Sequence, residues 1–325
     1  FPYTTLFRSE NLKKEIIHKS IDLGISDIKF TNSNISDSVV SNYSKWLELG
    51  YNAQMKYLEN QKDKRSNPNL ILENVKSIIV CALNYFPGNH PTNLENVGKV
   101  ARYAIGKDYH IVFKDKLIEL ANFILEREPA SQAKVYVDTG AILERYWAEK
   151  AGLGWQGKNG NIISTKFGSY FFIGIIFSTI EFEPDEQISN HCGKCTLCLT
   201  HCPTNAIVQP KVIDSNKCIA YWTIEAKPDF EIPENIQNAN PDWIFGCDIC
   251  QEVCPWNKKY AIKTTITEFL NLHNLTLELE KILILKQDEF SKQFKNSPIK
   301  RTKLSGLKRN AMALINSKNE KSKGV

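Results

Sequence analysis

Long apolar runs are missing from this 325-residue sequence. The longest one, residues 171–177, falls far short of the ~20 apolar residues that a membrane-spanning helix needs, so no such helix is predicted. No secretory or organellar targeting segment is recognisable. We therefore expect a cytoplasmic protein in a reducing compartment, where thiols stay free.

The sequence also lacks a complete phosphate-binding loop of the nucleotide hydrolases. Residues 152–160 approach the pattern G-x4-G-K-[ST], but Asn159 occupies the position where Ser or Thr must reach magnesium. The loop also leads into a predicted strand, whereas a phosphate-binding loop opens a helix. Nucleotide hydrolysis is thus excluded, and two interpretations remain: a plain glycine turn, or a backbone cradle for polar groups of another ligand.

Acidic residues are scarce at the C-terminal end. Residues 292–325 contain ten Lys or Arg against one acid, Glu320, so this segment carries +9 while the net charge of the whole chain is +5. A basic end on a mildly acidic body is typical of a nucleic-acid contact, with Lys300, Arg301, Lys303, Lys308 and Arg309 as its densest group. A solvated, frayed tail explains the same charge equally well.

Cysteine is concentrated in one region. Eight of the nine cysteines lie between residues 192 and 254, in two runs that each close with Cys-Pro. The first run has the spacing C-x2-C-x2-C-x3-C-P, which is the signature of two-cluster bacterial ferredoxins. The second run has Ile244 in place of its first cysteine, and Cys218 is the natural replacement. The ninth cysteine, Cys81, lies in a predicted strand and is expected to be packed in the core.

The spacing predicts two [4Fe–4S] clusters, because three cysteines of such a run hold one cube and the fourth crosses over to the other. Two four-cysteine zinc sites are the alternative, although zinc ribbons rarely use a three-cysteine run closed by proline. A disulfide framework is less compatible with a long chain that has no secretory signal. By symmetry, cluster one takes Cys192, Cys195, Cys198 and Cys254, and cluster two takes Cys202, Cys218, Cys247 and Cys250.

Predicted strands alternate with helices over residues 10–184, which indicates an α/β or α+β domain. A small ferredoxin-like two-cluster domain is expected over residues 185–262 and a basic helical segment over 263–325. Residues 1–9 do not continue the helical pattern and are expected to be an added extension. The expected strands are 27–30, 77–84 and 133–137, the expected helices are 10–23, 111–127 and one through 144–150, and a hairpin is expected from 162–164 and 169–177.

Asp138 follows one of these strands and precedes a helix. It is either the N-cap of that helix or an acid at the mouth of the sheet, and residue pattern alone favours the cap. Several cations near glycine turns and aromatics are either surface charges or contacts for an anionic or amide-rich ligand: Arg65, Arg102, Lys107, Arg145 and Lys158.

Taken together, the motifs over residues 10–315 resemble those of one family, the epoxyqueuosine reductases, which are cobalamin-dependent iron–sulfur enzymes that complete queuosine on tRNA. The residues that carry the resemblance are Gly-Lys-Asp-Tyr-His (106–110), Val-Asp-Thr-Gly (137–140), Glu-Arg (144–145), Glu-Lys-Ala-Gly-Leu-Gly-Trp (149–155), Gly-Lys-Asn (157–159), Phe-Glu-Pro-Asp (182–185), Cys-Pro-Thr-Asn-Ala-Ile (202–207), Lys-Cys-Ile-Ala-Tyr-Trp-Thr-Ile-Glu (217–225) and Phe-Gly-Cys-Asp-Ile-Cys-Gln-Glu-Val-Cys-Pro-Trp-Asn (245–257). Many members carry a further helical-repeat domain, and this chain ends at Val325, so a short or truncated form is expected.

The resemblance implies that Asp138 is the catalytic proton donor, with a pKa raised by burial against cobalamin. It also implies cobalamin in the base-off form between the two domains, which agrees with the lack of a histidine in an Asp-x-His-x-x-Gly arrangement. The clusters would pass single electrons to cobalt for reductive opening of the epoxide. The expected cobalamin contacts are Arg65, Arg102, Asp138, Lys158, Asn159, Ile162, Tyr221, Thr223 and Asp248.

The expected partners are a tRNA that carries epoxyqueuosine and an external low-potential electron donor of the flavodoxin or ferredoxin type, and a monomer is expected. Two other functions remain as alternatives. A pure electron-transfer ferredoxin module explains the eight cysteines but leaves more than half of the chain without a role. A reductive dehalogenase for small molecules would bind cobalamin without affinity for tRNA.

Overall fold

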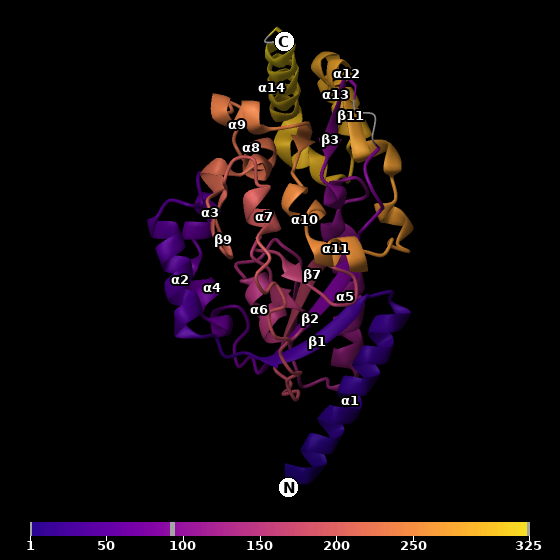
Figure 1. Ribbon diagram of the computed structural model, residues 1–325. Helices are drawn as coiled ribbons and strands as arrows, with labels where there is room; N and C mark the ends of the chain where they lie inside the picture. The colour runs from indigo at the N-terminus through magenta and orange to yellow at the C-terminus, as the bar shows by residue number, and fades with distance from the viewer. Residues whose placement is uncertain (1, 92–94, 324–325) are drawn as a thin grey trace.

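The computed structural model describes residues 2–91 and 95–323 (Figure 1). Its central element is a four-stranded antiparallel sheet in the order β1-β2-β7-β4. The strands expected at 27–30, 77–84 and 133–137 are confirmed, with small changes at their ends. The four strands are β1 (Asp27–Asn32), β2 (Ser77–Asn84), β7 (Phe171–Ser178) and β4 (Ala133–Tyr136).

The expected hairpin is wrong. The first segment forms β6 (Ile162–Ile163), which pairs with β5 (Trp155–Gln156), while β7 pairs with β2 and β4. A single isolated bridge, Ser164 to Gly168, is the pairing that joins the two segments in the described residues. Apolar runs this short do not specify a partner strand, so tertiary packing decided the pairing.

The central sheet is buried on both faces, and β2 is buried along its whole length. Because successive strand residues point to opposite faces, β2 contributes alternately to two cores. Ile79, Cys81 and Leu83 pack toward one core, and Ile78 and Val80 pack toward the other. The expectation that Cys81 is a core residue is confirmed, since its exposure is 0%.

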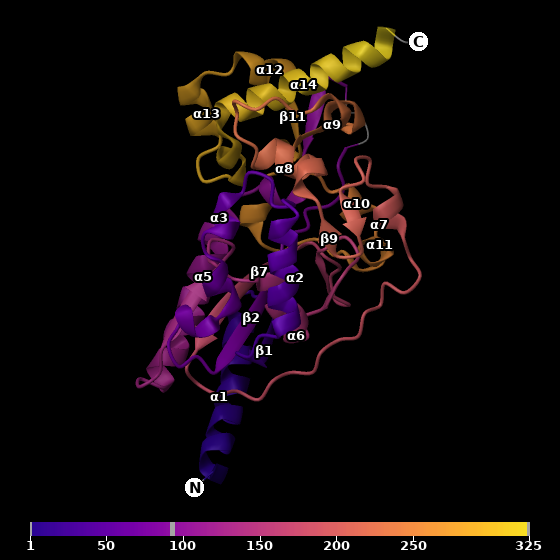
Figure 2. The ribbon, with the colours of Figure 1, turned by 90° about the vertical axis from the view of Figure 1, so that its left-hand side faces the viewer.

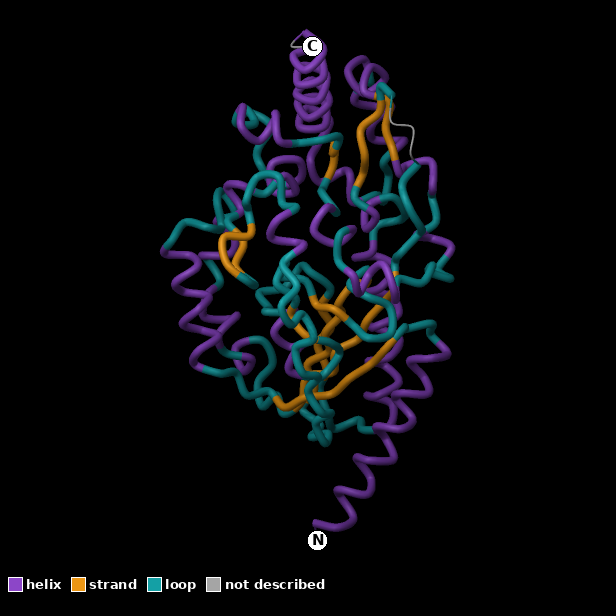
Figure 3. Tube along the Cα trace, in the orientation of Figure 1, coloured by secondary structure: helices purple, strands orange, loops and turns teal. Residues whose placement is uncertain are grey.

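Helices cover each face of this sheet (Figures 1 and 3). On one face lie α1 (Pro2–Asp22) and α5 (Tyr109–Arg127), which contribute Ile16 and Phe113 to the core. On the other face lies α6 (Glu144–Lys150), which contributes Trp147. Helix α1 begins at Pro2, so the segment expected to be an extension continues the helix predicted after it. The remaining helices before β2 are α2 (Asp37–Glu48), α3 (Lys56–Glu59), α4 (Lys62–Ser66) and the 3-10 turn η1 (Pro68–Leu70).

The cysteine region follows a long irregular connection after β7, which runs along the outside of the molecule in Figure 2. The region itself is made of short elements: α7 (Leu197–Thr200), β8 (Ile207–Gln209), β9 (Val212–Ile213), η3 (Ser215–Lys217), α8 (Ile219–Ile224), α9 (Glu234–Ala239), β10 (Trp243–Phe245), α10 (Ile249–Glu252) and α11 (Pro255–Tyr260).

A second, three-stranded sheet joins parts of the chain that are distant in sequence. In it β3 (Val97–Val100) lies between β10, which is parallel to it, and β11 (Thr276–Glu278), which is antiparallel. One strand therefore comes from each of the three segments that sequence analysis separates at residues 184 and 262.

The C-terminal segment is packed, not frayed. It consists of the 3-10 turns η4 (Thr267–Phe269), η5 (Leu272–Leu275) and η6 (Pro298–Thr302), and the helices α12 (Leu279–Ile284), α13 (Gln287–Gln293) and α14 (Lys303–Lys323). Leu304, Leu307 and Leu314 of α14 share a buried cluster with Phe245 of β10. The predicted helices are confirmed, and β11 was missed. Within residues 2–91 and 95–323, no helix combines the length and apolarity that crossing a membrane requires.

Candidate active site and cluster site

Asp138 lies in the loop between β4 and α6 with a left-handed backbone, φ 55°. The N-cap position of α6 is Leu143, so the interpretation of Asp138 as the cap of this helix is wrong. Its backbone N–H instead donates to Oε1 of Glu144 across 2.6 Å. A non-glycine residue held at positive φ is costly and is often found where function requires a particular side-chain direction.

Two side chains from the start of α5 contact the Asp138 carboxylate. Tyr109 Oη donates to Oδ2 of Asp138 at 2.5 Å, and His110 Nε2 lies 3.6 Å from the same oxygen. Asp108 positions both, because it is the N-cap of α5 and accepts the backbone N–H of His110 at 3.0 Å. The Tyr109 ring is fixed further by stacking on Phe172, with 4.0 Å between the centroids.

These contacts set the protonation of the Asp138 site. Desolvation by the surrounding protein raises the pKa of Asp138, but hydrogen bonds from His110 and Tyr109 and the charges of His110 and Arg145 outweigh it, so its pKa lies below the usual value. Burial lowers the pKa of His110, yet its contacts with Asp108 and Asp138 raise it to about 9. The sequence-based expectation of a raised Asp138 pKa is thus not met by the protein contacts alone.

Glu144 is the second carboxyl of this site. Burial, followed by the nearby charge of Asp138, raises the pKa of Glu144 to about 8. Two neighbouring carboxyls therefore differ in their protonation: at neutral pH Asp138 is the anion and Glu144 holds its proton. Groups with pKa values pushed apart in this way are typical of sites that transfer protons.

Charged and phenolic groups from both halves of the chain interact electrostatically with Asp138. The charges of Asp138 and Glu225 both raise the pKa of Tyr103, after burial, and both act on Tyr57 together with Arg301. The phenol of Tyr57 is 47% exposed, and the Asp138 side chain is 59% exposed. The Asp138 carboxylate is therefore accessible to a ligand.

The eight clustered cysteines divide into two groups by proximity. The thiol of Cys198 is influenced by Cys192, Cys195 and Cys254, after burial, which is the set expected for cluster one. The thiol of Cys250 is influenced by Cys218 and Cys202 of the set expected for cluster two, and also by Cys198 of the other set, while that of Cys247 is influenced by Cys250 and Cys218, so the assignment of each cysteine to one cluster remains a prediction. Burial raises the pKa of these thiols, a cost that bound iron removes because it holds thiolates. All nine cysteines are free of disulfides.

The described residues contain no group of three or more His, Cys, Asp or Glu side chains placed to hold a single metal ion. A backbone N–H of Ala206 already donates to Sγ of Cys202 at 3.3 Å, the kind of contact that tunes iron–sulfur clusters.

One expected cobalamin contact, Arg65, and one residue that was not expected, Gln54, have buried polar atoms without a partner in the described part of the chain. Arg65 is 7% exposed, and its Nη1 has no hydrogen-bond partner among the described residues. The same holds for Oε1 of Gln54, whose backbone N–H donates to the Tyr221 hydroxyl at 3.2 Å. Buried polar atoms without partners are costly, and a polar ligand would satisfy them. Arg65 thus offers a hydrogen-bond donor and Gln54 an acceptor, which are the groups that amide side chains of a ligand bond.

Other expected contacts are already bonded to protein groups. Lys158 Nζ donates to the carbonyls of Gly193 and Cys195 at 2.8 Å each, and Asn159 Nδ2 donates to the Cys250 carbonyl at 3.2 Å. The glycine loop therefore holds the cysteine runs in place. Thr223 Oγ1 bonds to Ile219 and Gly246, and Ile162 is buried in β6. For these residues, contact with cobalamin remains a prediction.

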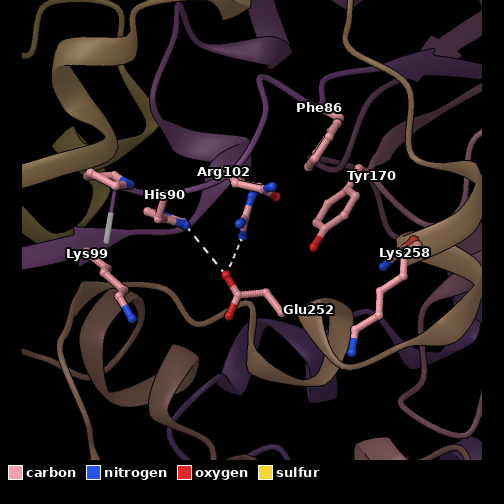
Figure 4. Close-up of a pocket in the computed structure, with 10 residues that line it drawn as sticks. Phe86, His90, Lys99, Arg102, Tyr170, Glu252 and Lys258 are labelled. Atoms are coloured by element: carbon pink, nitrogen blue, oxygen red, sulfur yellow. Dashed lines mark hydrogen bonds and ion pairs between the residues drawn. The ribbon is translucent and has the colours of Figure 1, made fainter. Parts of the chain in front are cut away.

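Arg102 connects the first sheet region to the cluster region. It is 4% exposed, and its Nη1 contacts Asp248 at 3.0 Å and Glu252 at 2.7 Å, while Nε donates to the Gly88 carbonyl. Arg102 also forms part of the wall of a pocket of about 390 Å³, which Figure 4 shows with Glu252 at its centre. The other lining residues are Phe86, Asn89, His90, Pro91, Lys99, Tyr170, Asn257 and Lys258.

The five expected tRNA contacts differ in how free their charges are. Lys300, Lys303 and Lys308 have no ion pair within the described part of the chain, and the first two are exposed. Arg301 pairs with Glu225. Arg309 donates to the carbonyls of Trp222, Lys227 and Phe230 at 2.6–3.0 Å, so its guanidinium serves within the protein.

Sequence reasoning missed Tyr109, His110, Glu144, Glu225 and Tyr57 as members of the Asp138 site. Tyr109 and His110 belong to the motif at residues 106–110, which was noticed without a role. Asp108 was the signal in the sequence that could have identified them. An aspartate at this position is typical of a helix N-cap, and the two residues after an N-cap lie in the first turn of the helix. Tyr57 and Glu225 carry no local signal and are placed by tertiary packing.

The fold and the site define an iron–sulfur protein in which a double-cluster region is joined to a mixed α/β domain that carries an acid–histidine–tyrosine group. Residues 191–257 match the family model "4Fe-4S double cluster binding domain", and residues 65–139 match "Epoxyqueuosine reductase QueG, DUF1730". The chain belongs to the epoxyqueuosine reductase family.

Curated relatives and solved structures of the same family are similar to this chain over most of its length. The chain is 42% identical to the epoxyqueuosine reductase of Synechocystis sp. over 90% of this chain and 99% of the relative, and 40% identical to that of Cellulophaga algicola over 90% and 94%. It matches a crystal structure of epoxyqueuosine reductase with an epoxyqueuosine-modified tRNA-Tyr stem loop at a TM-score of 0.89 and 31% identity, covering 97% of this chain and 83% of that one. The Bacillus subtilis enzyme, in a structure with its catalytic aspartate loop swung out of the active site, matches at 0.89 and 30% identity, covering 97% and 83%.

Proposed function

We propose that this protein reduces epoxyqueuosine to queuosine in tRNA, and that Asp138 delivers a proton to the reacting base. The observation that carries the proposal is the Asp138 group: an accessible carboxylate at φ 55°, bonded to Tyr109 and close to His110. Membership of the family supports the reaction, and the tRNA stem loop in a homologous structure supports the substrate class.

The chemistry requires both electrons and protons. Removal of an epoxide oxygen as water, leaving a carbon–carbon double bond, consumes two electrons and two protons. Cys192, Cys195, Cys198 and Cys254 would hold one [4Fe–4S] cluster and Cys202, Cys218, Cys247 and Cys250 the other, and such clusters would provide one-electron chemistry when bound. Asp138, His110 and Glu144 are the groups of this chain that can carry protons to the base.

Cobalamin fits the residues present, and we propose it as the third cofactor. Arg65 and Gln54 offer unpaired buried atoms, and Tyr221 is bonded to Gln54. When bound, cobalamin would supply a strongly reducing centre for opening the epoxide. Residues of this chain would orient the base, exclude water and keep a proton on the Asp138 side of the site.

The remaining parts of the proposal follow the division of the chain. Residues 10–184 would carry Asp138 and most of the cobalamin site, residues 185–262 would hold the clusters and add Tyr221, Thr223 and Asp248 to the cobalamin site, and residues 263–325 would make the tRNA backbone contacts through Lys300, Lys303 and Lys308. An external low-potential protein of the flavodoxin or ferredoxin type would supply electrons to a monomer.

Replacement of Asp138 by Asn tests the proposal. The Asp138→Asn protein should keep its fold, its iron and its cobalamin, and lose ~10²–10⁴-fold in single-turnover reduction of an epoxyqueuosine stem loop, since general acid catalysis is worth this much. Glu181→Gln, on the exposed connection after β7, is the matched control. A fully active Asp138→Asn protein would refute the role of Asp138, and an unmutated protein that leaves the epoxide intact would refute the function.

A further inference from the structure

His110 lies between two carboxylates, hydrogen-bonded to Asp108 and within ion-pair distance of Asp138. His110 Nδ1 lies 2.7 Å from Oδ1 of Asp108, and its Nε2 lies 3.6 Å from Oδ2 of Asp138. The imidazole thus has a carboxylate at each nitrogen. The His110 ring also stacks on Tyr109, with 4.1 Å between the ring centroids, so its orientation is fixed from a third side.

The contacts of Asp138 favour its ionised form, so its proton must come from a neighbouring group. The hydrogen bonds and cations around Asp138 keep it ionised at neutral pH, so a lone Asp138 would begin each turnover without a proton to give. The reaction needs two protons. A group next to Asp138 must therefore hold a proton in the resting state and pass it on.

We propose that His110, held as an imidazolium by Asp108, is a relay residue that transfers its Nε2 proton to Asp138 during turnover. The inference rests on the proposed function. The step is balanced: the His110 N–H bond breaks, an O–H bond forms at Oδ2 of Asp138, and Asp138 then gives the proton to the departing epoxide oxygen. Solvent returns a proton to His110, which is 30% exposed.

The titratable groups around His110 act in different directions: the carboxylates of Asp108 and Asp138 favour its charged form, Glu144 adds no charge while it holds its proton, and the cation of Arg145 opposes a second positive charge. Asp108 and Asp138 contact the ring, Glu144 lies beyond Asp138, and Arg145 acts on Asp138 from α6. Oδ2 of Asp138 accepts the hydrogen bond from Tyr109 and is also the oxygen nearest to His110 Nε2. The described contacts of His110 thus offer its nitrogens only acceptors.

The test combines kinetics with a measurement that does not depend on turnover. In cobalamin- and cluster-loaded protein, His110→Gln should lower the single-turnover rate on an epoxyqueuosine stem loop by at least about tenfold, within the range of general acid–base effects. The unmutated rate should fall above about pH 9 as His110 loses its proton, and His110→Gln should lack this fall. Because Glu144 titrates nearby, the profile is also recorded with Glu144→Gln. His273→Gln, an exposed histidine on η5, is the matched control.

Two further arms separate a relay from a structural role. Added imidazole should restore activity to His110→Ala but not to Asp138→Asn. In ¹⁵N-histidine NMR of the oxidised, cluster-loaded protein, the His110 pKa should fall in Asp108→Asn and in Asp138→Asn. Inactive Asp138→Asn together with fully active His110→Gln would overturn the relay alone. An unchanged His110 pKa in both variants, or no rescue by imidazole, would also overturn it.

Discussion

Arg301 and Glu225 form a bidentate ion pair, with Nε–Oε1 at 2.6 Å and Nη2–Oε2 at 2.8 Å. The pair joins η6 of the basic C-terminal segment to the end of α8, next to the Asp138 site. Because Glu225 already neutralises Arg301, a tRNA phosphate would have to compete for this guanidinium. The free positive charge of the segment therefore resides on its lysines.

The first prediction concerns those lysines. The triple variant Lys300→Ala, Lys303→Ala and Lys308→Ala should raise the Kd for any tRNA. It should also make the slope of log K against log salt shallower, by ~0.7–0.9 for each of up to three lost phosphate contacts. Arg301→Ala should change the slope less. A salt titration of tRNA binding measures this, with Lys14, Lys76 and Lys114 replaced together as the control. Equal slopes for the two triple variants would move the RNA path elsewhere.

The second prediction concerns the buried ion pair of Arg102 and Asp248, whose side chains are 4% and 3% exposed. Arg102→Met leaves the Asp248 charge buried without its partner and should destabilise the fold by about 3–5 kcal/mol. Arg301→Met breaks an exposed pair and should cost about 0–1 kcal/mol. Denaturant melts of the anaerobic, cluster-loaded proteins compare the two variants. Equal midpoints would show that Arg102 is not the link between the two regions.

Iron content provides the third prediction. The anaerobic protein should contain about eight iron atoms per chain, in two cubes. Replacing Cys198 or Cys250 by Ala should lose one cluster or degrade it, whereas Cys81→Ala should keep both, because Cys81 is buried in the core between sheet and helices. Iron and sulfide analysis with an absorption spectrum decides this. Zinc in place of iron would contradict the assignment.

The fourth prediction concerns the pH dependence of stability at Glu144. Its pKa is about 8 in the folded protein and about 4.5 when unfolded, so the folded state binds more protons between these values. The contribution of Glu144 to stability is therefore present below about pH 4.5 and is lost as pH rises through 8. Glu144→Gln, which can still accept the Asp138 N–H, should gain stability over the unmutated protein from pH 5.5 to 8.5. Thermal melts of both proteins at pH 5.5 and pH 8.5 measure this. If the Tm of Glu144→Gln and that of the unmutated protein change equally between the two pH values, the raised pKa of Glu144 is refuted.

Much of the fold was readable from the sequence because local signals agree with it. Continuous apolar runs marked β2 and β7 as buried, and the cysteine spacing predicted the double-cluster region that the family model confirms. The resemblance singled out Asp138, while local pattern favoured a cap. The contacts that Tyr109 and His110 make with Asp138 could not be predicted, since they depend on the packing of α5 beside the loop after β4.

The three-stranded sheet also sets the order in which the protein can be assembled. Its central strand β3 is made early in synthesis, but its neighbours β10 and β11 come from residues 243–245 and 276–278. Until those residues have left the ribosome, β3 has unpaired edges, and pairing over so long a separation is intrinsically slow. If the cluster region were cut free at residues 185 and 262, β10 would lose β3, the strand with which it pairs. Iron loading and maturation of the whole chain should therefore be a single, late event.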